Sequence, residues 1–197
     1  MDAPPDDPIQ LFAQVYQQAV EAIPLDPNAM VLSTAGAGGR RPTSRVVLMK
    51  GFDARGFTFY TNLRSRKARE ALENPWAALC FFWRPLDKQV RIEGRVEQVS
   101  DAEADEYFAT RPRGSQVGAW ASLQSEPLPS RELLEARVAE VEARYAGVSV
   151  PRPAHWSGLR VVPDRMEFWT SRPNRLHDRV LYRKAEGGGW TRELLYP

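Results

Sequence analysis

Two segments of this sequence carry basic side chains in positions suited to an anion. Arg45 begins an apolar segment that Lys50 ends, so the two cations stand at opposite ends of one expected strand. Ser65-Arg66-Lys67 stands where a helix is expected to begin, and the free N–H groups and dipole of a helix N-terminus favour a phosphate. Arg66 and Lys67 by themselves are more typical of a solvated surface than of a binding site, so it is the helix start that points to a ligand.

A third group combines a phenol, a guanidinium and a hydroxyl. Tyr107, Arg111 and Ser115 follow one another at intervals of four residues, across a joint that contains Pro112. Such a set suits a phosphate, because the guanidinium offers a planar fork of donors and the hydroxyls add single hydrogen bonds. Two phosphate-sized sites in one small chain predict two phosphorylated ligands.

The residues present argue against several other kinds of chemistry. Cys80 is the only cysteine, and His155 and His177 are the only histidines, which argues against an internal disulfide and a zinc site. Cys80 lies in an apolar stretch and is interpreted as a buried structural thiol. No nucleophile elbow or Walker A loop occurs, and Gly36-Ala-Gly38 is interpreted as a hairpin turn. The chemistry is therefore expected to come from a bound cofactor or from arginine, lysine, serine and acidic side chains.

Length and composition favour one soluble domain. The 197 residues suit a single domain, and the 43% hydrophobic content excludes a disordered chain. The net charge is only +2, but residues 40–69 and 171–184 are rich in lysine and arginine, which suits a compact anionic ligand better than a nucleic acid. No apolar run is long enough for a membrane span, and the first eight residues lack the features of a signal peptide. A cytoplasmic location is expected, with residues 1–7 disordered.

Short-range signals predict the elements of the N-terminal half. A helix is expected to begin at Asp7 or Pro8 and to end before Pro24. Ser65 is expected to cap a short helix over residues 66–73. Strands are expected at residues 29–34, 44–51 and 56–61. The second strand is expected to be buried on both faces, because Val46 to Met49 are all apolar.

The C-terminal half is expected to alternate between hairpins and helices. Ser100 and Glu103 form a capping box for a helix that ends at Thr110. Further helices are expected at residues 113–121 and 130–145, the latter amphipathic. Strands are expected at residues 76–83, 88–99, 158–162, 166–170, 180–184 and 190–194. About seven or eight strands, mostly in hairpins, with helices at the edges indicate an α+β fold built on an antiparallel barrel.

Five blocks of the sequence, in the same order and spacing, resemble the pyridoxine/pyridoxamine 5′-phosphate oxidase family. The blocks are Arg45-Val-Val-Leu-Met-Lys50, Tyr60-Thr-Asn-Leu-Arg-Ser-Arg-Lys67, Gln89-Val-Arg-Ile-Glu-Gly94, Tyr107-Phe-Ala-Thr-Arg-Pro-Arg-Gly-Ser115-Gln-Val-Gly-Ala-Trp120, and Met166-Glu-Phe-Trp169 with Arg175-Leu-His-Asp-Arg179. The resemblance extends from about Asp7 to Pro197. It implies an antiparallel split β-barrel with peripheral helices, and a homodimer that holds FMN at the subunit interface.

The resemblance also assigns roles residue by residue. The residues it implies for FMN binding are Arg45, Val46, Val47, Leu48, Met49, Lys50, Tyr60, Thr61, Ser65, Arg66, Lys67, Gln89, Gln124, Ser125, Trp169 and Arg179. The residues it implies for the substrate phosphate are Lys50, Tyr107, Arg111 and Ser115. Arg175 and His177 match the pair that lies over the pyridine ring and are the expected catalytic residues. Apart from the family, His177 reads as a surface-loop histidine.

The implied reaction is an FMN-dependent oxidation of pyridoxine or pyridoxamine 5′-phosphate to pyridoxal 5′-phosphate, with O₂ reduced to H₂O₂. One alternative is a related flavin oxidase of the phenazine-pathway type, whose substrate has no use for the Tyr107, Arg111 and Ser115 group. Another is a non-catalytic flavin- or haem-binding module, or a small basic barrel that binds single-stranded nucleic acid. The continuously apolar stretch at residues 76–83 argues against the nucleic-acid reading. No membrane partner is expected.

Two features depart from the family pattern. The basic N-terminal extension that folds over the substrate in the family is nearly absent, because residues 1–7 are few and acidic. The C-terminus reads Glu193-Leu-Leu-Tyr-Pro197, where the family typically ends in Arg-Leu-x-Pro. The substrate lid and the last C-terminal contacts are therefore expected to differ.

Overall fold

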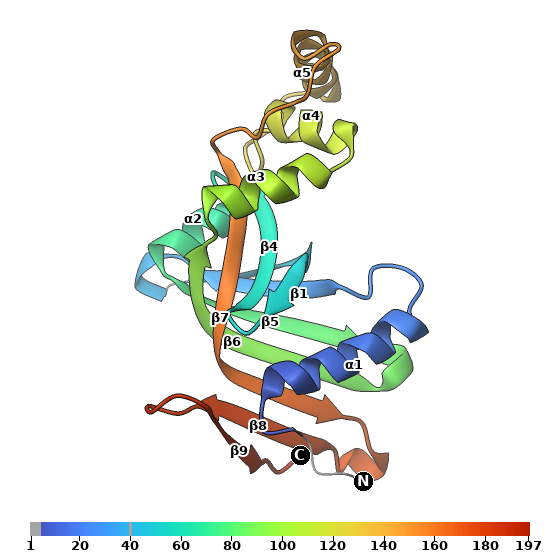
Figure 1. Ribbon diagram of the computed structural model, residues 1–197, viewed down its shortest axis with the longest axis vertical. Coiled ribbons are helices and arrows are strands. Elements are labelled where there is room, and N and C mark those ends of the chain that lie inside the picture. Colours follow the sequence, from blue (N-terminus) through green and yellow to red (C-terminus); the bar gives the residue numbers. More distant parts are fainter. Residues whose placement is uncertain (1–4, 40) are drawn as a thin grey trace.

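A curled antiparallel sheet dominates the computed structural model, which describes residues 5–39 and 41–197 (Figure 1). Within that part the sheet has nine strands. They are β1 (Ala29–Ala35), β2 (Pro42–Leu48), β3 (Gly51–Asp53), β4 (Gly56–Asn62), β5 (Trp76–Trp83), β6 (Lys88–Gln98), β7 (Trp156–Thr170), β8 (Asp178–Lys184) and β9 (Trp190–Leu194). The main path runs β2-β1-β5-β6-β7-β4-β3, and β8 and β9 continue from β7. The α+β class and the antiparallel half-barrel are thus as expected.

The long strand β7 organises the sheet. One of its edges pairs with β6 over almost its whole length, whereas the other edge pairs first with β4 and then with β8. The β6–β7 register shifts between Glu93 and Gly94, at a β-bulge. Only glycine fits there, because a Cβ on Gly94 would lie 2.0 Å from the carbonyl oxygen of Val162. The two strands expected at residues 158–162 and 166–170 are therefore one strand, and that expectation was wrong.

In the described part of the chain, five α-helices cover the ends and one side of the sheet. They are α1 (Pro8–Ala22), α2 (Arg66–Glu73), α3 (Asp101–Thr110), α4 (Arg113–Ala121) and α5 (Arg131–Arg144). The predicted caps of α2 and α3 are confirmed, since Ser65 and Ser100 each accept a backbone N–H of their helix. Asp7 and Ser130 cap α1 and α5 in the same way. In Figure 1, α3, α4 and α5 lie above the sheet, whereas α1 crosses its lower part. None of these helices is long and apolar enough to cross a membrane.

The core has two parts. The larger one fills the concave side of the sheet, where Phe12 of α1 packs edge-on against Phe57 with ring centroids 4.8 Å apart. The smaller one, made of Phe108, Val117, Val150 and Trp156, lies under α3 and α4. It fixes the two helices that carry Tyr107, Arg111 and Ser115.

One expectation about the burial of a strand was wrong. Strand β2 is an edge of the sheet rather than a strand buried on both faces, and the side chain of Val46 is 65% exposed. It ends at Leu48, so Met49 and Lys50 connect β2 to β3. Strand β5 alternates between buried and exposed positions, and Trp76 and Phe82 are about half exposed. Helix α5 buries none of its residues in this chain.

Residues 1–4 and Arg40 lie outside the described residues, so the expected disorder of residues 1–7 stays a prediction for the first four. The neighbouring residues are in contact with the fold. The carbonyl of Pro5 accepts a hydrogen bond from the Tyr182 hydroxyl at 2.8 Å, and the Asp7 carboxylate accepts one from the backbone N–H of Ile9.

Candidate functional site

A cavity of about 480 Å³ lies between the β2–β4 side of the sheet and helices α2, α3 and α4. Most of the residues predicted from the N-terminal and central blocks gather on its wall. They are Val46, Val47, Leu48, Lys50, Tyr60, Thr61, Lys67, Tyr107, Arg111, Ser115 and Gln124. Segments far apart in the sequence therefore converge on one space large enough for a small ligand.

Arg111 lies at the joint between α3 and α4, where Pro112 prevents one continuous helix. Its guanidinium lies over the ring of Trp156, 4.6 Å from the centroid, and 5.4 Å from that of Phe108. Burial lowers the pKa of Arg111, and its buried Nη1 has no hydrogen-bond partner among the described residues. A buried donor without an acceptor is costly, so an anion in the cavity would satisfy it.

Aromatic rings hold the same wall in place. Tyr60 stacks on Tyr107 with centroids 3.9 Å apart, and on Trp156 at 5.3 Å. Burial raises the pKa of both tyrosines, so their phenols keep their protons near neutral pH and act as donors. The Tyr60 hydroxyl donates to the Glu103 carbonyl at 3.5 Å. The cavity thus offers Arg111 and the Tyr107 phenol on one side and the ammonium group of Lys50 on another.

The start of α2 forms the opposite end of the cavity. The Lys67 ammonium donates to Thr61 Oγ1 at 3.3 Å and to Gln124 Oε1 at 3.2 Å. Burial and the charge of Arg45 lower the pKa of Lys67. The backbone N–H of Arg66 donates to Ser125 Oγ at 3.2 Å, which ties the loop after α4 to this helix start. Three cations close together favour an anion between them.

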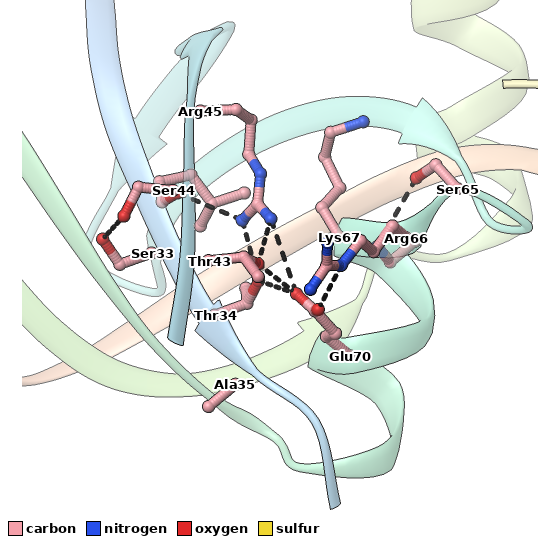
Figure 2. Close-up of polar contacts among 12 residues, drawn as sticks. Ser33, Thr34, Ala35, Thr43, Ser44, Arg45, Ser65, Arg66, Lys67 and Glu70 are labelled. Atoms are coloured by element: carbon pink, nitrogen blue, oxygen red, sulfur yellow. Dashed lines mark hydrogen bonds and ion pairs between the residues drawn. The ribbon is translucent and has the colours of Figure 1, made fainter. Parts of the chain in front are cut away.

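Arg45 does not line the cavity but lies near Lys67, which does (Figure 2). Its Nη1 donates to Thr34 Oγ1 at 2.7 Å and to the Leu32 carbonyl at 3.1 Å. Its Nη2 lies 3.4 Å from the carboxylate of Glu70, which also accepts from Arg66 Nε at 2.8 Å. Arg45 and Arg66 are therefore joined through one buried carboxylate.

Four further predicted residues form a second group elsewhere. Gln89, Trp169, His177 and Arg179 line a cavity of about 690 Å³ between α1, β6, β7 and β8, which shares no lining residue with the first. The His177 ring lies 4.6 Å from Trp169, centroid to centroid. Arg179 is held by the buried Glu167, with Nε 2.8 Å from its Oε1. Within one chain, the predicted site residues therefore lie in two separate cavities.

Six predicted residues line neither cavity, namely Arg45, Ser65, Arg66 and Ser125 beside the first one, and Met49 and Arg175, which lie apart. The side chain of Met49 is buried in the larger core, and its backbone N–H and carbonyl are both bonded to Asn28. Arg175 is exposed, and its backbone has a φ of 63°, next to Asn174 with a φ of 58°. Left-handed backbone at two successive non-glycine residues is strained. The structure therefore holds the Arg175 segment in an unusual conformation but does not bring Arg175 to His177's cavity.

Sequence reasoning missed Trp156, Glu70 and Glu167. Trp156 lies under Arg111, and the two glutamates bind the arginines of the two groups. Only one local signal was present, namely the four-residue spacing of Arg66 and Glu70, which is that of a helical ion pair. His155, interpreted as structural, donates its Nε2–H to the Ala119 carbonyl at 3.0 Å.

Comparison with protein families gives two matches that together cover most of the chain. A family model described as pyridoxamine 5′-phosphate oxidase matches residues 16–145. A second model, described as the pyridoxine 5′-phosphate oxidase C-terminal dimerisation region, matches residues 156–197.

Individual proteins agree with the family models. A pyridoxine/pyridoxamine 5′-phosphate oxidase of Myxococcus xanthus (strain DK1622) is 66% identical over 98% of this chain and 93% of its own length. The corresponding protein of Rhodospirillum rubrum is 59% identical over 97% of this chain and 96% of its own length. The crystal structure of PhzG from Burkholderia lata 383, in complex with tetrahydrophenazine-1-carboxylic acid, superposes with a TM-score of 0.93. PhzG is 36% identical, over 100% of this chain and 95% of that one. The chain therefore belongs to the pyridoxine/pyridoxamine 5′-phosphate oxidase family.

Proposed function

We propose that this protein oxidises pyridoxine 5′-phosphate or pyridoxamine 5′-phosphate to pyridoxal 5′-phosphate. The observation that carries the proposal is the buried, unpartnered Nη1 of Arg111, which lines the same cavity as Tyr107, Ser115 and Lys50. A phosphate monoester supplies the acceptor that this group lacks. The alcohol substrate gives up two electrons and two protons, and O₂ becomes H₂O₂. The amine substrate also takes up water and releases ammonia.

FMN is the proposed cofactor, and the residues present fit it. Lys67, through its ammonium group and its backbone N–H at the start of α2, and the neighbouring Arg66 would bind its phosphate, and the wall formed by Val46 to Leu48 would contact its ring. When bound, FMN supplies the two-electron oxidation, since no side chain of the chain is a suitable redox group. The protein's part is to bind and orient the substrate and to exclude water from the cavity.

The proposed active enzyme is a homodimer. The two separate groups of predicted residues support this, because residues of one group could complete the other group of a second copy. The exposed apolar side chains of Val46, Val31 and Phe82 lie on the sheet face between them. Register places Phe82 opposite Gln89, and Gln89 opposite Trp169, so this apolar face continues into the second group.

Arg175 and His177 are the proposed catalytic residues, and they would lie over the substrate's ring. His177 Nδ1 accepts the backbone N–H of Arg172 at 3.2 Å, so its Nε2 is the nitrogen left to hydrogen-bond a substrate or to exchange a proton. Arg175 would stack its guanidinium on the pyridine ring once the second copy brings the two groups together.

A phenazine-pathway type of oxidase is the second candidate, favoured by the high TM-score to PhzG. The higher identity to proteins named as phosphate-substrate oxidases and the group around Arg111 favour the first candidate. The fold alone does not separate the two, because both kinds of protein share it.

The proposal is tested by loading the purified protein with FMN and adding pyridoxine 5′-phosphate in air. We expect aldehyde formation with an equal amount of peroxide, and none from unphosphorylated pyridoxine. Bound FMN with no product would move the proposal to another substrate, and failure to bind FMN would contradict the enzyme reading.

A further inference from the structure

Glu70 lies among the predicted cofactor-binding residues, but it is not one of them and no role was predicted for it. It lies on α2, one helical turn after Arg66, and only about a tenth of its side chain is exposed. The two oxygens have different partners. Oε1 accepts from Arg66 Nε at 2.8 Å, and Oε2 accepts from the hydroxyls of Thr34, at 2.7 Å, and Thr43 (Figure 2).

The two threonines connect Glu70 to Arg45. Thr34 and Thr43 are directly opposite each other on β1 and β2. Each hydroxyl donates its proton to Glu70 and accepts an N–H of Arg45, on Nη1 for Thr34 and on Nη2 for Thr43. The carboxylate can only accept hydrogen bonds, so both threonine hydroxyls must donate to it and accept from Arg45. Glu70 thereby sets the orientation of the hydroxyls and, through them, of the Arg45 guanidinium.

The arrangement leaves a defined set of donors open. Among the described residues, the terminal nitrogens of Arg66, the Nε of Arg45 and the backbone N–H of Lys67 have no protein partner. The net charge at this helix start is +2, from the three cations Arg45, Arg66 and Lys67 and the carboxylate of Glu70. That matches a phosphate monoester, which carries about −1.5 to −2 near neutral pH.

We propose that Glu70 is a positioning residue for the FMN phosphate, which holds Arg45 and Arg66 in the orientation that the phosphate requires. This inference rests on the proposed function, because FMN is the ligand that it concerns. Glu70 would act before the ligand arrives, by keeping two like-charged guanidinium groups close together in fixed geometry.

Simple electrostatics predicts the opposite effect of Glu70 on FMN binding, and this difference gives the proposal a clear test. A carboxylate near a phosphate repels it, so its neutralisation alone would strengthen FMN binding. Positioning predicts the reverse. In Glu70→Gln the ion pairs with Arg45 and Arg66 are lost. An NH₂ group at the threonines would also take away the acceptor of both hydroxyl protons, so the hydroxyls, and the Arg45 guanidinium bound to them, would have to reorient.

The experiment compares FMN with riboflavin, which has the same ring system but no phosphate. Flavin-free protein is titrated with each ligand, and the quenching of flavin fluorescence gives the Kd. For Glu70→Gln we expect FMN binding to weaken about tenfold or more, as for the loss of a hydrogen bond to a charged group, with riboflavin binding unchanged. Glu73→Gln is the matched control, because Glu73 is an exposed carboxylate on the same helix. It should bind both flavins as the wild type does.

Each other outcome overturns the proposal. FMN binding that is unchanged or tighter in Glu70→Gln would exclude positioning. An equal weakening for FMN and riboflavin would assign Glu70 a general structural role. If Glu70→Gln does not fold, Glu70→Asp replaces it, because the shorter side chain keeps the charge but cannot reach Arg66 and the threonines together. Wild-type protein that binds neither flavin would overturn the proposed function itself, and this inference with it.

Discussion

At the scale of single residues, Arg111 is the most informative side chain in the chain. Removal of its guanidinium in Arg111→Ala should raise the KM for pyridoxine 5′-phosphate by about 10- to 100-fold, the equivalent of about 1.5–3 kcal/mol. The reason is that uniform binding of the phosphate is lost, so kcat should change much less. Steady-state kinetics check this. Arg113→Ala is the control, because Arg113 binds the carbonyls of Tyr145 and Val148 instead. An unchanged KM in Arg111→Ala would remove Arg111 from the phosphate site.

Arg175 should behave in the opposite way. In Arg175→Ala we expect kcat to fall by about tenfold or more while FMN stays bound, because the side chain would orient the substrate's ring rather than hold the cofactor. Turnover and the flavin content of the same preparation are measured together. If loss of flavin accounts for the whole defect, the role proposed for Arg175 is wrong.

The ionisation of Glu70 makes a separate prediction about stability. Burial raises its pKa, but hydrogen bonds from Thr43, Thr34 and Arg66 outweigh burial and hold the pKa at about 2, against 4.5 for a free glutamate. A lowered pKa means that the stabilisation is complete above pH 4.5 and is lost as the pH falls toward 2. The difference in unfolding free energy between wild type and Glu70→Gln should therefore shrink below pH 4.5. Urea unfolding at several pH values checks this, and a difference independent of pH would contradict it.

The residues that sequence reasoning found and missed differ in one physical respect. Arg111, Tyr107 and Ser115 were predicted because their spacing along one segment already brings them together. Trp156 and Glu70 act only through contacts with distant segments. Glu70 needs the cross-strand pair of Thr34 and Thr43, which no local pattern of the sequence reveals.

At the scale of elements, helix α3 shows how local capping supports the site. The Ser100 hydroxyl accepts the backbone N–H of Glu103 at 3.2 Å, and the Glu103 carboxylate in turn accepts the backbone N–H of Ser100. Arg160, almost fully buried, donates to the other oxygen of Glu103 at 2.7 Å. The capping box thus ties α3, which carries Tyr107, to β7.

Loss of this cap should affect both stability and substrate binding. In Ser100→Ala we expect a loss of about 1 kcal/mol and a Tm lower by roughly 2–4 °C. The KM for the phosphorylated substrate should rise, because Tyr107 is on this helix. Ser130→Ala is the matched control, since it removes the cap of α5, which buries none of its residues. Thermal unfolding and kinetics are measured on both variants. A KM that rises equally in Ser130→Ala would show that the effect is not specific to α3.

The boundaries of the elements were predictable where local chemistry sets them. Ser65 and Ser100 begin their helices where their caps indicated, because a cap acts within one turn. Strand β7 was not predictable in the same way. Val162-Pro-Asp-Arg165 reads as a turn, but pairing with β6 and the bulge at Gly94 carry the strand through it. Non-local pairing overrides the local signal there.

At the scale of the whole molecule, the sheet leaves an apolar face exposed in one chain. Val46 on β2 is opposite Val31 on β1, which is opposite Cys80 on β5, and Phe82 lies on the same face of β5. Exposed fractions of 65%, 38% and 54% for Val46, Val31 and Phe82 are unusual for neighbouring apolar side chains in a monomer. The sequence predicted that β2 is buried on both faces. A second copy of the chain packed against this face would bury it.

A charge placed on this face should separate the two copies and weaken cofactor binding together. In Phe82→Glu we expect a shift from dimer to monomer of at least about tenfold in Kd, because an unpaired carboxylate would be buried at the interface. FMN affinity should fall in parallel, since Gln89, Trp169 and Arg179 of one copy would no longer reach the cavity of the other. Sedimentation velocity over a range of concentrations and flavin titration check the two effects. Val148→Glu, at an exposed apolar position on the loop after α5, is the control. A Phe82→Glu protein that is monomeric yet binds FMN as tightly as wild type would show that each chain holds a complete cofactor site, which the two separate cavities argue against.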